Sequence, residues 1–432
     1  MRGDTDGIRG GSIAVVGGSI AGCAFARAAA RNGAEQVVVL ERTPGRLEDR
    51  GVGLCVHDDR FAELAQAGHL DDGIRRHRLT ERHWVARDGA AGPRGRLLWV
   101  QPMPFHSYHW GVLWQALRER TPDTVAFRLA ETVAGAGGDQ DGAWVEGADG
   151  RRESYDLVIG ADGYRSMVRE AVCPEARPEY AGYICWRGSF PSEHLAELPG
   201  GAGVWPETEA ITACFPGGQC VIYRIPGLTP GSTQVNWVLY GAPPAELGRR
   251  LDNPTSIPPG ELTDELLSHG RRLAEEQLPP YWAGVLGLTP AERTFVQPIY
   301  DLETPRRTSG RLLLAGDAAT VVRPHNTSGA VKAVQDAWAF ENAWREGGSW
   351  AELLDSYDRE RGQVGRELVA LGRRLGTAQV GPQAPDWSTI DEAGMTAWWQ
   401  RQVTGGGGFG GQALSAPPAP RQASSAAPLR HR

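Results

Sequence analysis

Residues 12–41 read SIAVVGGSIAGCAFARAAARNGAEQVVVLE, and they carry the clearest fold signal in the sequence. A short apolar run, Ile13 to Val16, ends at a glycine-rich turn, and an alanine-rich stretch follows as far as Asn32-Gly33, a pair typical of a helix end. A second apolar run then ends at Glu41. The order strand, glycine turn, helix, strand predicts a βαβ unit, and therefore an α/β fold that starts near residue 12.

The turn Gly17-Gly18-Ser19-Ile20-Ala21-Gly22 approximates the dinucleotide-binding fingerprint, which has glycine at its first, third and sixth positions. Ser19 takes the middle glycine position, as a small residue that keeps a donor near a phosphate. Glu41 follows 19 residues after Gly22, where an acid binds ribose hydroxyls, and the helix N-terminus supplies an anion site. Because Glu41 would repel a 2′-phosphate, the pattern predicts FAD or NAD rather than NADP here.

Two later apolar runs also end at an acid beside a glycine. Leu157 to Gly160 leads into Asp162-Gly163, and Arg311 to Leu314 leads into Gly316-Asp317. An acid at the end of a buried strand can accept a hydrogen bond from a sugar hydroxyl. Each motif alone fits an ordinary strand-to-helix turn, so their order along the chain carries more information than either one.

The chain changes character near Glu179. Short runs with β-branched and aromatic residues follow as far as Tyr240, and Gly217-Gly218 separates two of them, which predicts a hairpin in an antiparallel sheet. Helical patterns are expected over residues 261–277, 330–345 and 351–375. The composition after about residue 402 is rich in Gly, Ala, Pro and Ser, which predicts a disordered tail.

Composition excludes several classes of protein. The 432-residue chain has a net charge of −7, which argues against nucleic acid as a partner. No apolar run reaches the roughly 18 residues of a membrane span, and the N-terminus lacks a signal pattern. Six cysteines without CxxC spacing predict no metal site and suit a reducing compartment. We expect a cytoplasmic protein that contacts no membrane.

One residue is unusual for its type. Of the 45 basic residues, only Lys332 is a lysine. A GC-rich genome explains the bias toward arginine, but a position that keeps lysine is one where a compact ammonium suits better than a planar guanidinium. Lys332 lies in the first turn of the helix expected after Asp317, so we predict that its ammonium lies near the cofactor or supports the turn before that helix.

The three motifs in this order resemble those of the class A flavoprotein aromatic hydroxylases, the family of para-hydroxybenzoate and phenol hydroxylases, over about residues 12–375. Residues 180–188, 223–227 and 323–333 are most similar to its 2,6-dihydroxypyridine hydroxylase branch. The resemblance implies an FAD-dependent monooxygenase that uses NAD(P)H and O₂ to hydroxylate a small aromatic or heteroaromatic substrate through a flavin C4a-hydroperoxide. NAD(P)H would bind transiently, in keeping with the lack of a second glycine fingerprint in the sequence.

The resemblance also implies an α/β fold, with a Rossmann-like FAD-binding domain, an antiparallel-sheet substrate domain and C-terminal helices. The expected boundaries are 12–178 for the first part of the FAD-binding domain, with a substrate-side segment inserted near 75–110, then 179–295 for the substrate domain, 296–375 for the second part of the FAD-binding domain with a long helix, 376–402 for a C-terminal helical segment, and 403–432 for the disordered tail. A homodimer is one oligomeric state that the sequence leaves open.

Site residues follow from the same resemblance. The expected cofactor-binding residues are Gly17, Gly18, Ser19, Ala21, Gly22, Glu41, Arg42, Cys55, Asp162, Asp317, Pro324, Thr327, Ser328, Gly329, Ala330 and Lys332. His325, in the turn beside the flavin, and His57 are the candidate catalytic residues, because a phenolic substrate reacts faster once it has lost its proton. Tyr183, Arg187 and Tyr223 are the candidate substrate contacts.

One departure from the family pattern leaves alternatives open. Many members have an arginine that opens a helix, with leucines three and seven positions on; here Leu113 and Leu117 fit, but the first place is Trp110. Ser19 and Trp110 keep open a catalytically inactive flavin-binding protein. A second alternative is the same fold performing epoxidation or oxidative rearrangement of a secondary metabolite. Halogenation is disfavoured, because the sequence has no Trp-x-Trp-x-Ile-Pro stretch.

Overall fold

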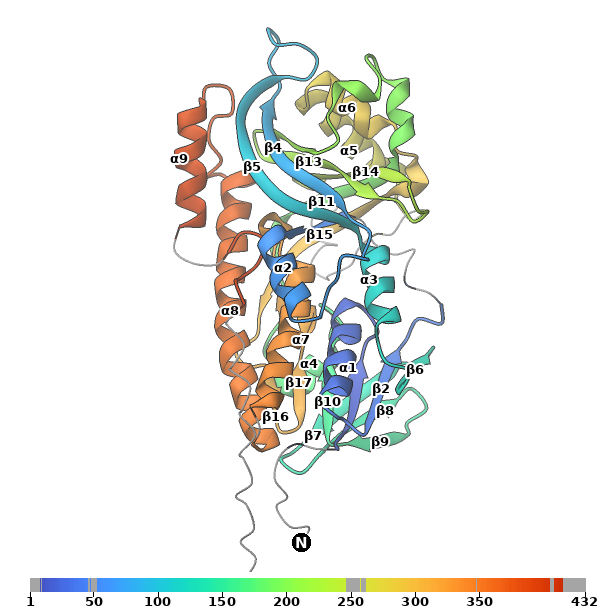
Figure 1. Cartoon of the computed structure of the whole chain (residues 1–432). Coiled ribbons are helices and arrows are strands. Elements are labelled where there is room, and N and C mark those ends of the chain that lie inside the picture. The colour runs from blue at the N-terminus through green and yellow to red at the C-terminus, as the bar shows by residue number, and fades with distance from the viewer. Residues whose placement is uncertain are drawn as a thin grey trace, which may run out of the picture.

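The structure is a computed structural model that describes residues 8, 10–45, 47, 53–245, 257, 262–346, 348–404 and 408–414. It contains two main sheets arranged along the long axis of the molecule (Figure 1). A mainly parallel sheet lies in the lower half of this view and a larger, mainly antiparallel sheet in the upper half. The long helix α8 (Trp350–Gln379) runs beside both.

The parallel sheet has six strands in the order β16-β17-β10-β1-β2-β6. Strand β1 (Ser12–Val16) lies between β2 (Gln36–Glu41) and β10 (Leu157–Gly160), and helix α1 (Ile20–Arg31) connects β1 to β2. The predicted βαβ unit is therefore confirmed. The other strands are β6 (Val125–Leu129), β16 (Thr308–Ser309) and β17 (Leu312–Leu314); β16 alone pairs antiparallel.

Both faces of this sheet are covered, which explains why its strands are continuous apolar runs rather than alternating ones. On one face α1 packs against α3 (Trp110–Glu119) and α7 (Gly329–Arg345). The other face packs against α4 (Val168–Val172) and a three-stranded sheet made by β7 (Val133–Gly138), β8 (Ala143–Gly147) and β9 (Arg152–Tyr155).

The antiparallel sheet has nine strands in the order β18-β15-β11-β14-β13-β12-β4-β5-β3. The predicted hairpin is confirmed, and its turn contains Gly217 at φ +79°, a backbone conformation that glycine adopts without strain. The strands are β3 (Gly53–His57), β4 (His77–Ala86), β5 (Arg96–His109), β11 (Glu179–Pro191), β12 (Glu209–Phe215), β13 (Gly218–Pro226), β14 (Thr233–Gly241), β15 (Thr294–Glu303) and β18 (Thr320–Val321).

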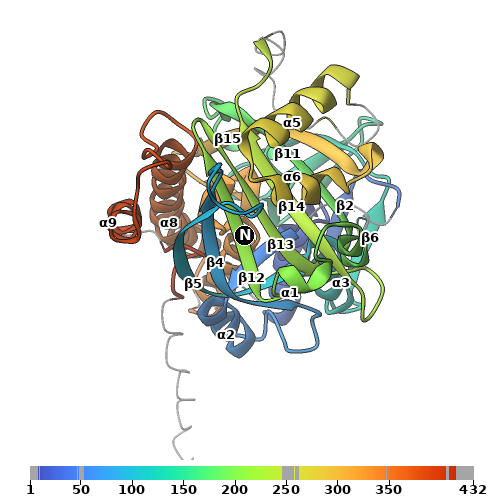
Figure 2. The same ribbon diagram turned by 90° about the horizontal axis from the view of Figure 1, so that it is seen from above.

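Strands β3, β4 and β5 come from the N-terminal part of the chain yet lie in this second sheet. Strand β4 joins it by pairing parallel with β12, which lies about 130 residues later in the chain. The segment expected near 75–110 on the substrate side corresponds to β4 and β5. Helices α5 (Asp264–Gln277) and α6 (Pro280–Gly287) cover the far face of the sheet (Figure 2), so its other face is turned toward the parallel sheet.

The C-terminal region corrects one prediction. Helix α9 (Glu392–Val403) packs against Trp84 and α8, and residues 408–414 then run back along the molecule. Phe409 contacts the rings of Phe105 and Trp399, and the Gly410 N–H donates to the Asn326 carbonyl at 2.9 Å. The prediction of disorder is therefore wrong for 408–414, because one aromatic ring and a few backbone bonds hold a glycine-rich segment in place. Residues 405–407 and 415–432 lie outside the described residues.

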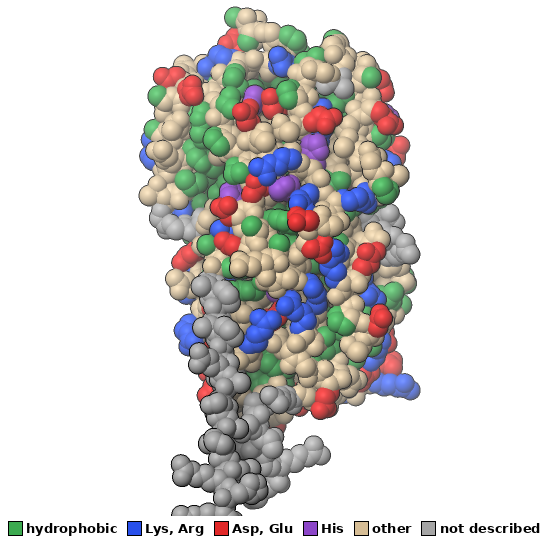
Figure 3. Space-filling view, viewed as in Figure 1, with side chains coloured by type: hydrophobic (Ala, Val, Ile, Leu, Met, Phe, Trp, Pro, Cys, Tyr) green, Lys and Arg blue, Asp and Glu red, His purple; other side chains and the backbone are tan. Residues whose placement is uncertain are grey.

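Surface features complete the description. No helix within the described ranges is long and apolar enough to cross a membrane. On the face shown in Figure 3, basic side chains gather in the central part of the molecule, with acidic side chains among them. Helix α2 (Asp58–Gln66) lies on this side of the molecule, between the two main sheets (Figure 1).

Candidate active site

A cavity of about 730 Å³ is lined by residues of both sheets. The parallel sheet contributes the ends of β1, β2 and β10 and the turn after β17. The antiparallel sheet contributes side chains that include Arg82, Arg187 and Tyr223. This volume lies within the range of about 300–1,000 Å³ that is usual for cofactor and ligand sites.

The glycine turn after β1 brings the backbone close to this cavity. Gly17 has φ +100°, and a Cβ added there would lie 2.5 Å from the Ala161 carbonyl oxygen. A Cβ added at Gly22 would lie 1.9 Å from the Gly17 carbonyl oxygen, so glycine is required for α1 to approach β1. Ser19 is the N-cap of α1 and its side chain makes no capping bond, so the first-turn N–H groups can serve an anion.

Glu41 ends β2 at the rim of the same turn. Its carboxylate accepts hydrogen bonds from the Gly18 N–H and the Thr43 N–H, both at 2.8 Å. These bonds orient the carboxylate at the end of β2, which is the place where an acid of a dinucleotide-binding fold accepts from ribose hydroxyls. Gly18 and Gly22 shape this turn without lining the cavity, whereas Gly17, Ser19, Ala21, Glu41, Arg42 and Cys55 line it.

Two further carboxylates follow β10 and β17. One oxygen of Asp162 accepts from the Met167 N–H at 2.7 Å, while its other oxygen is buried without a partner in the part of the chain that the structure describes. Burial raises the pKa of Asp162. The Asp317 side chain is 51% exposed and lines the cavity. A ligand with hydroxyl or N–H donors would provide hydrogen-bond partners for both carboxylates. The parallel-sheet end of the cavity therefore fits a dinucleotide cofactor, whose sugar hydroxyls are donors of this kind.

The turn before α7 is held in an unusual backbone conformation. Thr327 has φ +57°, in the left-handed region that few residues other than glycine adopt. Asn326 fixes the turn: its side-chain oxygen accepts from the Ser328 hydroxyl at 2.8 Å, and its nitrogen donates to the Leu368 carbonyl at 3.2 Å. Pro324, Thr327, Ser328, Gly329 and Ala330 all line the cavity.

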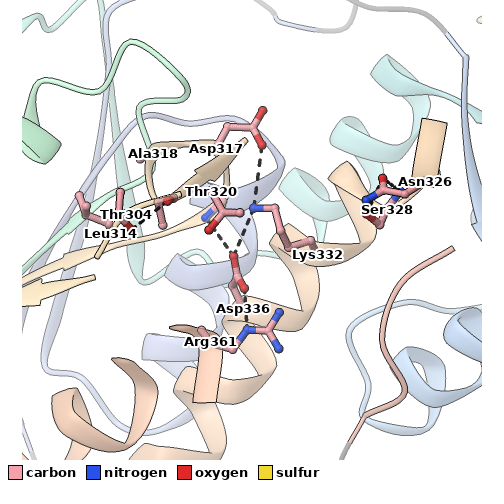
Figure 4. A network of polar contacts seen from close by, with 12 residues as sticks. Thr304, Leu314, Asp317, Ala318, Thr320, Asn326, Ser328, Lys332, Asp336 and Arg361 are labelled. Atoms are coloured by element: carbon pink, nitrogen blue, oxygen red, sulfur yellow. Dashed lines mark hydrogen bonds and ion pairs between the residues drawn. The ribbon is translucent and has the colours of Figure 1, made fainter. Parts of the chain in front are cut away.

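Lys332 lies behind the cavity wall rather than in the cavity lining, so of its two predicted positions the structure favours the one in which its ammonium supports a neighbouring turn. Its buried ammonium is 3.9 Å from Asp317 and 3.7 Å from Asp336, and Arg361 holds the other Asp336 oxygen at 2.7 Å (Figure 4). The Asp317 side chain is exposed only to the cavity, and the protein around it removes water from the carboxylate and raises its pKa; the charge of Lys332 opposes that rise. Asp336 also accepts from the Gly316 N–H at 3.1 Å. Lys332 therefore acts on the Gly316-Asp317 turn, and we interpret it as a positioning residue.

His325 stands at the opposite end of the cavity, and both of its ring nitrogens have partners. Nε2 lies 2.7 Å from the Tyr183 hydroxyl, and Nδ1 lies 3.1 Å from the Gln219 amide nitrogen. Burial, together with the charges of Arg323 and Arg82, lowers the pKa of His325 to about 3. The imidazole is thus neutral and fully engaged, which argues against the prediction that it takes a proton directly from a substrate.

Two other predicted residues lie outside the cavity lining. His57 caps α2, where its Nδ1 accepts from the Asp59 N–H at 3.1 Å, and its ring packs edge-on against Phe105. The prediction of a catalytic role for His57 is not supported by this position. Tyr183 contacts His325 and is not among the residues that line the cavity, whereas Arg187 and Tyr223 do line it.

An aromatic pair stands at the start of α3, where the resemblance to the flavoprotein hydroxylases led us to expect an arginine. Trp110 lines the cavity, and its ring lies parallel to that of Trp114 with centroids 6.4 Å apart. The Trp114 indole N–H donates to the Gly18 carbonyl at 2.8 Å, which ties α3 to the glycine turn.

Sequence reasoning missed several lining residues, namely Arg82, Gln219, Tyr240 and Phe409. Of these residues, only Phe409 could have been noticed in the sequence, because it is a single aromatic residue within a glycine-rich stretch. A group formed by Glu81, His83 and Glu209 could hold a metal ion, but it lies outside the cavity lining. Each ring nitrogen of His83 is already beside one carboxylate, at 3.0 Å and 3.6 Å.

Comparison with known proteins identifies similar chains. A family described as FAD binding domain-like matches residues 180–301, and one described as FAD binding domain matches residues 298–371. The chain is 28% identical over 382 residues to 2,6-dihydroxypyridine 3-monooxygenase of Paenarthrobacter nicotinovorans, covering 84% of this chain and 90% of that protein.

Solved structures share the fold. 2,6-Dihydroxypyridine-3-hydroxylase from Arthrobacter nicotinovorans matches with a TM-score of 0.74 at 24% identity, covering 88% of this chain and 96% of that chain. Klebsiella pneumoniae HpxO complexed with FAD and uric acid matches with a TM-score of 0.68 at 20% identity, covering 90% of this chain and 92% of that chain.

Proposed function

The chain belongs to the class A FAD-dependent aromatic hydroxylase family, and from this premise we propose that it uses NAD(P)H and O₂ to hydroxylate a small, electron-rich aromatic or heteroaromatic ring. The observation that carries the proposal is the shared cavity, because it joins the nucleotide-binding turns of one sheet to the aromatic and cationic side chains of the other.

The cofactor end offers a group for each part of FAD. The N-terminus of α1, opened by Ser19, would bind the pyrophosphate, and Glu41 would accept from the adenosine ribose. Asp317 would accept from the ribityl chain, and the turn at 324–330 would lie beside the isoalloxazine ring. When bound, FAD takes a hydride from NAD(P)H and, with O₂, supplies an electrophilic oxygen atom.

The substrate end of the cavity would position the substrate and keep water away from it. Met103, Tyr223, Tyr240 and Phe409 line it, and Tyr240 is almost fully buried. A site lined in this way excludes water and so prevents side reactions of a reactive intermediate with water. Hydrogen bonds with Tyr183 and Gln219 hold the His325 ring as part of that wall.

The test begins with the purified protein, which should be yellow and should contain close to one FAD per chain by absorbance. Oxidation of NADH or NADPH should rise when an aromatic substrate is added; 2,6-dihydroxypyridine is the first compound to try, because the relative named above acts on it. Under ¹⁸O₂, the product should gain one labelled oxygen as a ring hydroxyl. Absence of FAD, or NAD(P)H oxidation that no arene stimulates, would contradict the proposal. A labelled epoxide or rearranged product would identify the alternative chemistry.

A further inference from the structure

A second cavity lies behind the antiparallel sheet. Helices α5 and α6 lie over β11 and β14 in Figure 2, and a space of about 310 Å³ remains between these helices and the strands. We call this space the rear cavity and the one between the two main sheets the front cavity; no described residue lines both. The rear cavity is lined mainly by Trp186, Trp237, Leu239, Ala274, Ala283 and Leu286.

Two indole rings form the sheet wall of the rear cavity, and both are held in place. The Trp186 N–H donates to the Leu266 carbonyl at 3.0 Å, and the His269 ring stacks on Trp186 with centroids 5.5 Å apart. The Trp237 N–H donates to the Thr289 hydroxyl at 2.7 Å. Because these contacts fix both rings, neither turns inward to fill the space, and the rear cavity is preformed.

The helix wall of the rear cavity is built from small residues. Ala274 on α5 and Ala283 on α6 both line it. A Cβ added at Gly270 would lie 2.7 Å from the Trp186 ring, so glycine at this position lets α5 approach the sheet. Protein interiors are packed as densely as organic crystals, and unfilled apolar space lowers stability. A ligand that occupied the rear cavity would recover the missing contacts.

The chemistry of the lining selects an uncharged ligand. Among the described residues, those that line the rear cavity have no buried side-chain nitrogen or oxygen without a hydrogen-bond partner. At the rim, the exposed residues Arg271 and Glu275 carry opposite charges, so the opening has no net charge. An ion would lose its hydration here without gaining a partner, whereas an arene packs well against two indole rings.

The volume of the rear cavity sets the size of that ligand. An apolar cavity of about 150 Å³ stays dry and binds one benzene ring. The rear cavity has about twice this volume. We propose that it binds an uncharged, planar aromatic molecule of about two fused rings, and that this ligand changes how tightly the enzyme binds its substrate in the front cavity.

The two cavities are connected through shared strands. On β11, Arg187 lines the front cavity and directly follows Trp186, which lines the rear one. On β14, Val238 lines the front cavity between Trp237 and Leu239, which line the rear one. Because successive side chains of a strand point to opposite faces, a ligand that displaces either indole moves the backbone that carries Arg187 or Val238. This effect on the substrate rests on the proposed function, whereas binding in the rear cavity does not.

The first experiment counts bound naphthalene, an uncharged two-ring probe, by equilibrium dialysis of the FAD-loaded enzyme. Ala274→Leu fills the rear cavity from α5 and should lower the number bound at saturation by about one per chain. Ser268→Leu is the matched control, because Ser268 is exposed on the same helix and lies outside the lining; it should bind as much as the wild type. Ala283→Leu fills the same space from α6 and replaces Ala274→Leu if that variant does not fold.

The second experiment measures the KM for the aromatic substrate with and without saturating naphthalene. Naphthalene that enters the front cavity would change KM in the wild type and in both leucine variants. Only the part of the change that is missing from Ala274→Leu and retained in Ser268→Leu belongs to the rear cavity. That part should be roughly fivefold or more.

Equal numbers of bound naphthalene in the wild type and Ala274→Leu would overturn the binding site. A KM response that is the same in the wild type, Ala274→Leu and Ser268→Leu would overturn the effect on the substrate. Both results differ from failure of the proposed function, which would show as absent FAD or as NAD(P)H oxidation that no arene stimulates, because the dialysis needs neither NAD(P)H nor turnover.

Discussion

The two halves of the cavity are built in different ways. In the parallel-sheet half, the key groups follow directly from the ends of strands: Gly17 after β1, Asp162 after β10 and Asp317 after β17. In the antiparallel-sheet half, Arg82, Arg187 and Tyr223 project from the middles of strands, and Phe409 comes from near the end of the described chain. The comparison teaches that the cofactor end depends on backbone shape, whereas the substrate end depends on side-chain charge and packing.

The largest effect is expected from a change in backbone shape at the cofactor end. Gly17→Ala places a Cβ 2.5 Å from the Ala161 carbonyl oxygen at a residue with φ +100°. FAD content after purification should fall at least tenfold. Gly33→Ala is the control, since Gly33 also has a positive φ of +85° but an added Cβ meets nothing within 4 Å. It should lower stability by about 1–2 kcal/mol and retain FAD. Equal FAD content in the two variants would refute this account.

A smaller effect is expected from the charge network behind the same end. Lys332→Arg replaces a compact ammonium between Asp317 and Asp336 with a larger group that must share the space with Arg361. The Kd for FAD should rise roughly tenfold, equivalent to about 1.4 kcal/mol. Titration of apoprotein with FAD measures it, and an unchanged Kd would leave Lys332 without a role in the cofactor site.

Lys332→Met separates charge from size. Burial already raises the pKa of Asp317 and Lys332 opposes that rise, so removal of the ammonium should raise the pKa further. Asp317 accepts hydrogen bonds only through its unprotonated oxygens, and FAD affinity is therefore lost as pH falls through this pKa. The loss should begin at a higher pH in Lys332→Met than in the wild type.

The substrate end should respond to packing rather than backbone shape. Phe409→Ala removes a ring that lies 5.5 Å from Phe105 and 5.1 Å from Trp399 and opens one wall of the cavity. The KM for the aromatic substrate should rise roughly tenfold, about 1.4 kcal/mol, while FAD content stays the same. Phe409→Leu should restore most of the affinity. A loss of FAD instead would show that the segment serves the cofactor end.

The smallest effect is expected where a predicted catalytic residue lies outside the cavity. His57→Ala removes the cap of α2 and should cost about 1 kcal/mol of unfolding free energy, with turnover unchanged. His109→Ala removes the equivalent cap of α3, which carries Trp110 into the cavity. It should therefore weaken FAD binding as well. A large fall in kcat for His57→Ala would restore the sequence prediction.

The difference between a cofactor end that depends on backbone shape and a substrate end that depends on side chains also explains which parts of the molecule could be predicted from the sequence. The βαβ unit, the later motif strands and the order of the two sheets follow from local patterns, because a strand, a glycine and an acid lie within a few residues of each other. The face that a strand residue occupies depends on distant pairing. Arg82 stands between Glu81 and His83 in a polar strand, and only the pairing of β4 with β12 turns it toward the cavity.

Two other residues occupy places that local patterns do not reveal. Tyr183 was a candidate substrate contact, yet it is not among the residues that line the cavity, and its hydroxyl lies 2.7 Å from His325 Nε2, close to a break in register between β11 and β15. Phe409 lies in a segment whose composition indicates disorder, and contacts with Phe105 and Trp399 hold it in place. Neither contact is visible in the spacing of nearby residues.

The discontinuous parallel sheet has a consequence for synthesis on the ribosome. Strand β1 at residues 12–16 is joined to β10 and then to β17 at 312–314, and the turn that follows reaches residue 330. Until that part of the nascent chain has emerged, the apolar faces of the first strands have no complete sheet to join. Such a chain depends on protection from aggregation while it grows. We therefore expect FAD to be incorporated late, because residues as far along the chain as Phe409 line the cavity.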